Sequence, residues 1–339
     1  MRQGKESASG CGREAFQVFG SREIRTGGKA MKKRDFQFLS ADKQTKIHAV
    51  KWEPDGKELK GILQISHGMV EYVERYEKFA EFMVQQGFLV AGNDHLGHGK
   101  SVTSESQWGY FAPKNGSDIV VEDIDHLRRM METEHPGIPY FILGHSMGSF
   151  LLRKYLSQHG SGLKGAIIMG TGTHPNAALA LGKGLCRCLA LFRGWDHRSN
   201  LLEQAAMGGY NKKFKGGRAL NSWLTKDKEI VAAYSKEPRC SFKFTVNGYY
   251  TIFDTIHYIN RPENIGKIPK NLPLLFVAGE DDPVGNYGKG VKSVCGTYKK
   301  AGITDITCRL YPGDRHEILN ELDKEKVYKD IFKWIKAKM

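Results

Sequence analysis

The segment Gly144-His145-Ser146-Met147-Gly148 holds the residues most able to carry chemistry. It fits the pattern G-x-S-x-G, in which a strained turn between a strand and a helix projects a serine hydroxyl from the end of the strand. Glycine is needed two positions before and after the serine because the two backbones nearly touch there. An apolar run precedes the segment and a helical pattern follows it. The motif predicts Ser146 as a nucleophile, although an ordinary strand-to-helix turn can carry the same letters.

A serine hydroxyl is a poor nucleophile at neutral pH and needs a general base. His316 lies in a loop after an expected strand and before the last expected helix. Such a loop lies at the carboxyl edge of a parallel sheet, the edge that also carries Ser146. Among the twelve histidines of the chain, His316 is therefore the expected base.

The third group of such a site orients the imidazole and stabilises its charged form. Two aspartates, Asp281 and Asp282, follow another expected strand and precede Pro283. The order serine, acid, histidine along the chain is that of α/β-hydrolases and differs from the orders in chymotrypsin and subtilisin. Position in the chain leaves both aspartates open as the acid.

Two backbone N–H groups should stabilise the oxyanion of a tetrahedral intermediate. One belongs to Met147, the residue after the nucleophile. The other is expected at Met69, in the loop His67-Gly68-Met69-Val70. Gly68 lets the backbone of this loop approach the substrate carbonyl.

The segment from Asp94 to Ser101 contains two histidines and an aspartate within five residues, which invites comparison with a metal site. Its spacing lacks the H-E-x-x-H pattern, and no partner cluster of carboxylates and histidines follows elsewhere. We interpret it as a glycine-rich loop beside the active site. We expect no metal and no cofactor.

The elements that must position these residues follow from the apolar pattern. Residues 35–39 and 45–52 alternate apolar and polar side chains and predict a hairpin. Beyond residue 60, short apolar runs alternate with amphipathic stretches, which predicts a mostly parallel, doubly wound sheet of the α/β-hydrolase type. The expected parallel strands are 61–66, 88–92, 140–143, 165–170, 273–278 and 305–311.

The alternation stops at about residue 171 and resumes near residue 272. We interpret residues 171–260 as a mostly helical cap inserted into a core formed by residues 31–170 and 261–339. Residues 1–30 have neither periodicity nor the apolar segment of a secretory signal, so we expect a disordered extension. Because Met31 directly precedes the first expected strand, this extension is a candidate start-site artefact.

One expected cap helix carries an apolar stripe with cationic residues, Lys183 and Arg187, nearly opposite. The stripe consists of Ala178, Leu181, Leu185, Leu189 and Phe192. A cationic amphipathic helix can rest on an anionic membrane, and Lys212, Lys213, Lys215 and Arg218 add to the positive charge. The alternative is that the stripe packs against the core.

The composition sets further bounds on function. The 339 residues carry a formal net charge of +14, which favours acidic partners in general. No zinc finger, helix-turn-helix or RNA-binding strand motif accompanies the charge, so we expect no nucleic acid partner. The six scattered cysteines do not resemble a disulfide framework. No run of 18 apolar residues exists, and we expect a cytoplasmic protein, peripheral to the membrane at most.

Together these segments resemble the monoacylglycerol lipase and lysophospholipase branch of the α/β-hydrolases, often grouped with the serine aminopeptidases. The resemblance covers residues 33–338 and extends over five blocks in order. They are His67 to Glu71 with Arg75-Tyr76, Asp94 to Ser101, Gly144 to Gly148, Gly279 to Pro283, and Arg315 to Glu317. The resemblance selects Asp282 as the acid and implies a small-molecule acyl ester substrate. One departure is Tyr72, where the family often has histidine.

Three functions remain to be compared. The leading one is hydrolysis of monoacylglycerols, lysophospholipids or related esters through an acyl-enzyme. A peptidase of the serine aminopeptidase type would share the same catalytic residues, but it should carry acidic residues in its cap to hold a free amine. The cap has more Lys and Arg than Asp and Glu. A non-catalytic ligand-binding protein is the third alternative, although it has no need of a complete set of catalytic residues.

Overall fold

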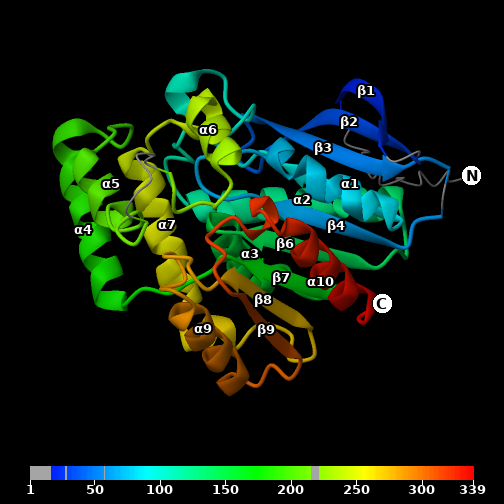
Figure 1. The fold of residues 1–339 in the computed structure, drawn as a ribbon. Helices are drawn as coiled ribbons and strands as arrows, with labels where there is room; N and C mark the ends of the chain where they lie inside the picture. The colour runs from blue at the N-terminus through cyan, green and yellow to red at the C-terminus, as the bar shows by residue number, and fades with distance from the viewer. Residues whose placement is uncertain (1–16, 27–28, 57, 215–220) are drawn as a thin grey trace, which may run out of the picture.

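The computed structural model describes residues 17–26, 29–56, 58–214 and 221–339, and a nine-stranded sheet runs through this part of the chain (Figure 1). The strand order is β1-β2-β3-β5-β4-β6-β7-β8-β9. β1 to β3 are antiparallel, and the strands from β5 to β9 in that order are parallel. The bounds are β1 Gln17–Thr26, β2 Lys29–Leu39, β3 Lys46–Pro54, β4 Gly61–Ser66, β5 Phe88–Asn93, β6 Tyr140–His145, β7 Gly165–Met169, β8 Leu274–Gly279 and β9 Ile306–Tyr311. The expected α/β-hydrolase fold is confirmed.

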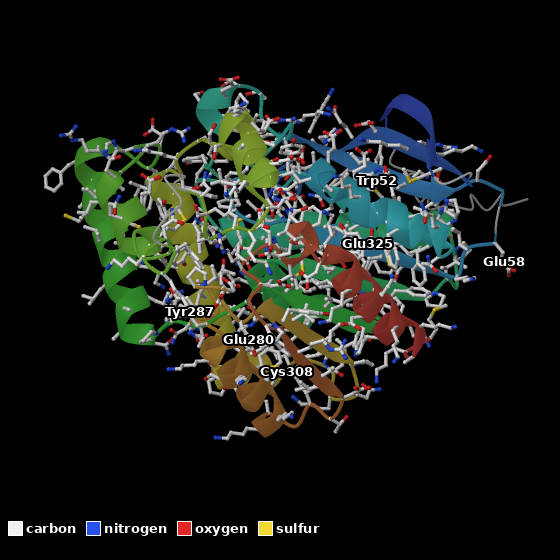
Figure 2. All side chains as sticks on the ribbon, in the orientation of Figure 1. Trp52, Glu58, Glu280, Tyr287, Cys308 and Glu325 are labelled. Carbon is white, nitrogen blue, oxygen red and sulfur yellow. The ribbon has the colours of Figure 1, made fainter. Side chains whose placement is uncertain are left out.

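Helices cover both faces of the sheet, which explains why the parallel strands are apolar throughout rather than alternating. On one face lie α1 (Glu77–Gln85) and α10 (Lys324–Lys336). On the other lie α2 (Gly116–Glu134), α3 (Met147–His159) and α9 (Lys289–Lys300). Trp52 of β3 is fully buried and donates its indole N–H to Glu77 of α1 at 3.3 Å (Figure 2).

The amino-terminal region corrects one expectation. Residues 1–16 lie outside the described residues, but Gln17–Thr26 forms β1 and pairs antiparallel with β2 from Gln17↔Gln37 to Thr26↔Lys29. The expected disorder of residues 1–30 is therefore wrong for this strand. Its sequence lacks regular apolar alternation, and backbone pairing with β2 is what specifies it. The dipeptide Gly27-Gly28, typical of short hairpin loops, was the available sequence signal.

Between β7 and β8 the chain forms a group of helices beside the carboxyl ends of the strands (Figure 1). They are α4 (Asn176–Arg193), α5 (Asn200–Met207), α6 (Lys228–Lys236), α7 (Val246–Ile259) and α8 (Pro262–Ile265). We retain residues 171–260 as the proposed cap. None of the helices in the described part of the chain is long and apolar enough to cross a bilayer.

The expected stripe on α4 divides into two parts. Leu185 and Leu189 are partly buried against the core, whereas Leu181 and Phe192 keep 76% and 79% of their surface exposed. The cations do not form a free opposite face: Lys183 pairs with Asp254 of α7 at 2.8 Å. Likewise, Arg187 donates a hydrogen bond to the Tyr250 hydroxyl of α7 at 2.9 Å. The expectation of a free cationic face at these two residues is therefore wrong. Lys215 and Arg218 lie outside the described residues.

A buried carboxyl group joins α2 to the loop between β2 and β3. Asp123 accepts hydrogen bonds from the Ser40 hydroxyl at 2.8 Å and the Ala41 N–H at 2.7 Å. Burial raises the pKa of Asp123 to about 7, against the opposing effect of the two hydrogen bonds. The folded protein therefore retains a proton here at a pH where the unfolded chain has released it.

We predict that Asp123 makes stability fall as the pH rises from about 4 to about 7. Between the unfolded and folded pKa values the native state binds the extra proton, so the free energy of unfolding should fall by up to about 1.4 kcal/mol per pH unit. Asp123→Asn should remove this slope, because the amide does not titrate. Urea unfolding of both proteins at several pH values measures the difference. A wild-type minus variant difference that is constant with pH would contradict the prediction.

Candidate active site

Ser146 lies at the turn between β6 and α3, with φ 54° and ψ −120°. Few non-glycine residues adopt a positive φ, and such strain persists only where the surroundings enforce it. Close packing around the two flanking glycines enforces this backbone conformation. A Cβ on Gly144 would lie 2.4 Å from the Gly148 carbonyl oxygen, and one on Gly148 would lie 2.1 Å from that of Ser66. The local sequence thus produces the predicted strained turn.

His316 and Asp282 meet beside this turn, in the loops after β9 and β8. The Nδ1 atom of His316 lies 2.9 Å from Oδ1 of Asp282, and both side chains are buried. The contact has the distance of an ion pair, but Nδ1 is not aligned for a hydrogen bond, as is common in unliganded sites. Asp281 instead pairs with Lys213, and both of these side chains are partly exposed. A Cβ on Gly170 would lie 3.1 Å from Cε1 of His316, so the ring has little freedom on that side.

The loop expected to supply an oxyanion donor lies directly against the serine. A Cβ on Gly68 would be 3.0 Å from the Cβ of Ser146. Met147 is the first residue of α3, where a backbone N–H has no acceptor within the helix. Within the described residues the N–H of Met69 donates to no backbone acceptor. Both expected donors are therefore available.

A buried network of ion pairs joins the loops that carry these residues. Arg75 donates to Oε2 of Glu71 at 2.7 Å and forms two bonds with Glu317, at 2.7 and 2.8 Å. Glu71 also accepts from the backbone N–H of Gly68 and lies 3.2 Å from Nδ1 of His145. Burial alone would raise the pKa of Glu71, but His145 and Arg75 lower it well below its usual range. The network joins the Gly68 loop, the nucleophile turn and the His316 loop.

Sequence reasoning missed this network. Arg75 and Glu317 belong to separate motif blocks, and 242 positions separate them in the sequence. A second missed contact links the proposed cap to the same loop, because Tyr234 of α6 donates its hydroxyl to the Val70 carbonyl at 2.9 Å. No local pattern predicts either contact.

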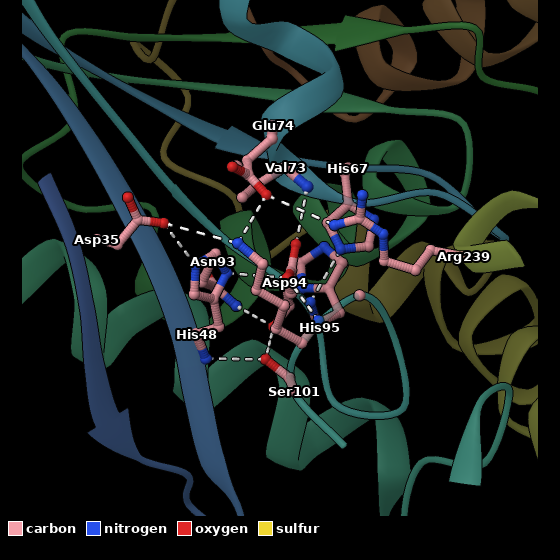
Figure 3. Close-up of polar contacts among 12 residues, drawn as sticks. Asp35, His48, His67, Val73, Glu74, Asn93, Asp94, His95, Ser101 and Arg239 are labelled. Atoms are coloured by element: carbon pink, nitrogen blue, oxygen red, sulfur yellow. Dashed lines mark hydrogen bonds and ion pairs between the residues drawn. The ribbon is translucent and has the colours of Figure 1, made fainter. Parts of the chain in front are cut away.

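Hydrogen bonds to the buried Asp94, directly after β5, connect several segments beside the active site (Figure 3). Asp94 is fully buried and accepts from the backbone N–H groups of Val73 and Lys100, at 2.9 and 2.8 Å. Its carboxylate also lies 2.9 Å from Nδ1 of His48. Burial would lower the pKa of His48, but its bonds to Asp35 and Asp94 raise it to about 9. Asp94 thus orders the start of the helical segment that carries Arg75.

The histidines of this segment are arranged as packing groups. His95 Nε2 lies 2.9 Å from the Ser66 hydroxyl, and His98 is 3.2 Å from the Leu96 carbonyl. Burial lowers the pKa of both rings. Elsewhere in the described residues, two groups of three side chains place their ligand atoms close enough together to bind one metal ion. They are Glu53, Glu134 and His135, and Glu122, Asp125 and His159. In each group a carboxylate already forms an ion pair, Glu134 with Lys51 and Glu122 with His159.

Ser146 and His316 open into one large cavity of about 2090 Å³. Ligand pockets usually measure about 300–1,000 Å³, so this cavity can hold a long ligand. Helices of the proposed cap form much of its wall. Its apolar lining includes Phe150, Leu179, Leu181, Leu185, Leu202, Val231, Ile252, Phe253, Ile256 and Val284.

Comparison with known proteins gives consistent matches. The family model described as serine aminopeptidase, S33 matches residues 57–323. A monoglyceride lipase homolog of monkeypox virus is 26% identical over 291 residues, covering 81% of this chain and 89% of the relative. Human monoglyceride lipase is 24% identical over 290 residues, covering 84% of each chain.

Solved structures of other proteins are also similar to this chain. A carboxyl esterase from Bacillus coagulans, in complex with glycerol, superposes with a TM-score of 0.83 at 30% identity and covers 90% of this chain and 98% of its own. A soluble variant of the Saccharomyces cerevisiae monoglyceride lipase, at 20% identity and a TM-score of 0.71, shares the fold. That match covers 98% of this chain and 99% of the yeast chain.

We predict that Arg75→Leu destabilises the protein by about 3–5 kcal/mol, because it leaves Glu71 and Glu317 buried without their cation. Arg129→Leu is the matched control: its partner Asp125 is mostly buried, but Arg129 itself is exposed, and such pairs contribute at most about 1 kcal/mol. Urea unfolding of both variants gives the comparison. Similar small losses in both would contradict the role of the network.

Proposed function

The chain belongs to the serine aminopeptidase S33 family of α/β-hydrolases and is a serine ester hydrolase, and we propose that it cleaves monoacylglycerols, lysophospholipids or related acyl esters. The observation that carries this proposal is that the strained Ser146 turn and His316, which lies against Asp282, line the same large, mainly apolar cavity. A long acyl chain matches such a lining, because its burial is favourable along its whole length.

In the proposed mechanism, Ser146 Oγ attacks the ester carbonyl while the free ring nitrogen of His316 accepts its proton. Asp282 orients the imidazole and stabilises its charged form. The N–H groups of Met69 and Met147 stabilise the oxyanion. His316 then returns the proton to the leaving alcohol, and an acyl-enzyme remains. Water, activated by the same histidine, releases the fatty acid.

The charges lining the cavity favour ester over peptide cleavage. An aminopeptidase needs an unpaired acid to hold the free amine of its substrate. Three acidic residues line the cavity among the described residues: Glu71, Glu203 and Glu317. Arg75 pairs with the first and last, and Lys243 lies 3.3 Å from Glu203. Each acid therefore already has a cationic partner, with Arg75 shared between Glu71 and Glu317.

We further propose a cytoplasmic protein whose cap docks transiently on anionic membranes or lipid aggregates. Leu181, Leu191 and Phe192 of α4 keep 76%, 84% and 79% of their surface exposed. Leu181 also lines the cavity, so this apolar surface adjoins the route to Ser146. The net charge of +14 favours an anionic surface, since each Lys or Arg near it contributes about 1 kcal/mol.

We predict that Ser146→Ala lowers turnover of p-nitrophenyl esters by roughly three to six orders of magnitude. Asp282→Asn should also cause a large loss, because the imidazole loses its charged partner. Asp281→Asn is the matched control and should retain near-normal turnover, since Asp281 pairs with Lys213. A panel from acetate to palmitate would also give the preferred acyl length. Activity of the serine variant within tenfold of wild type, or a larger loss at Asp281 than at Asp282, would refute the assignment.

We predict that the protein co-sediments with anionic vesicles at low salt and less at high salt. The triple variant Leu181→Ser, Leu191→Ser, Phe192→Ser should weaken this binding by roughly tenfold or more, because three exposed apolar contacts are lost. Leu322→Ser removes an apolar side chain outside the cap that is 68% exposed, and it serves as control. Equal partitioning to neutral and anionic lipids, or an unchanged triple variant, would count against docking through α4.

A further inference from the structure

A second, smaller recess of about 250 Å³ lies beside the catalytic cavity at the base of the proposed cap, and His174 lines both. Its walls come from α3, α8 and α9 and from the two segments through which the chain enters and leaves the cap. Thr173, His174 and Asn176 belong to the entering segment, and Ile259 and Asn260 to the leaving one. A ligand in this recess would contact both connections at once.

Arg153 of α3 lines the recess and is only 2% exposed. Its Nε donates to the Tyr298 hydroxyl at 3.1 Å, and its Nη1 donates to the Gly172 carbonyl at 2.8 Å and the Thr171 hydroxyl at 3.3 Å. All three acceptors are neutral. A guanidinium stays charged in proteins, so this buried charge lacks an anion among its hydrogen-bond partners.

The other buried arginines differ from Arg153. Arg75 binds Glu71 and Glu317, and Arg128 pairs with Glu132 at 2.8 Å. For Arg153, no carboxylate of the described residues lies within ion-pair distance. Burial of an unpaired charge is costly, and buried charges are normally paired. The Tyr298 ring lies 5.6 Å from the guanidinium carbon of Arg153, but no anion among the described residues balances the charge.

The rest of the recess suits a small anion. Its lining contains no Asp or Glu, so no negative charge repels such a ligand. Within the described residues Nη2 of Arg153 donates to no protein acceptor, which leaves its two N–H groups for a ligand. The hydroxyl of Ser293 on α9 and the side-chain amide of Asn176 line the same recess and can add neutral donors.

We propose that this recess binds a small oxyanion of phosphate size, held by the Nη2 edge of Arg153. Two N–H groups of a guanidinium match the oxygens of a phosphate group, and the charges attract. The bound anion neutralises Arg153 and bridges α3 to both connections of the cap. Because only the folded state binds it, the anion stabilises the folded protein increasingly as its concentration rises above the Kd.

The first test measures thermal unfolding and isothermal titration of the whole chain with inorganic phosphate, against chloride at equal ionic strength. Wild type should bind phosphate with a Kd in the millimolar range and show a rising Tm. Arg153→Gln should weaken binding by at least tenfold and lose the Tm response. Arg309→Gln, which removes an exposed arginine, is the matched control and should behave as wild type. A parallel titration with glycerol phosphate compares the affinity for a phosphate ester with the affinity for free phosphate, and the tighter ligand identifies the source of the anion.

A second variant keeps the proposal falsifiable if Arg153→Gln does not fold. Ser293→Asp places a carboxylate on an exposed position of α9 that lines the recess, and it should abolish the phosphate response while leaving Arg153 in place. An equal Tm response in wild type and in either variant would assign the effect to general salt stabilisation and overturn the site. The absence of any wild-type response to 50 mM phosphate would overturn it as well.

Discussion

The guanidinium of Arg75 lies between Glu71 and Glu317, and this buried interaction determines how three loops from distant parts of the chain meet. Glu71 holds the backbone of Gly68 and the ring of His145, while Glu317 directly follows His316. Ions in a low-dielectric interior are stable only when their geometry satisfies all of them together. A shift of one loop would leave charges unpaired in the other two. The serine turn, the Gly68 loop and the histidine loop are thereby held in one arrangement.

Residues whose roles depend on local pattern could be predicted from the sequence. The glycines around Ser146 define its turn, and the sheet order brings His316 and Asp282 to the same edge. Asp281 and Asp282 could not be separated by position, because both follow β8 immediately; their side chains diverge only in the folded loop. The Arg75–Glu317 contact and β1 escaped prediction for a different reason. Both depend on partners that become neighbours only when the sheet forms, and backbone pairing leaves little trace in side-chain pattern.

The chain combines a large positive charge with local pairing of most of its buried ions, Arg153 being the exception. Lys33, Lys51 and Lys154 each contact a carboxylate within the described structure. The surplus charge therefore lies mainly at the surface, where it affects association more than folding. Inside the molecule, ionised groups hold backbone segments in place, as Asp94 does for the residues before α1.

The helices between β7 and β8 begin and end at neighbouring strands that pair directly with each other. The sheet itself thus holds the two ends of this long insertion together, whatever the insertion contains. Lengthening such a loop costs only about 0.6 kcal/mol per doubling, because closure entropy grows slowly with length. This part of the molecule can therefore be replaced or resized, and with it much of the cavity wall, without altering the strands that position Ser146, Asp282 and His316. Changes to the shape of the cavity and changes to the stable core can thus accumulate in separate stretches of one sequence.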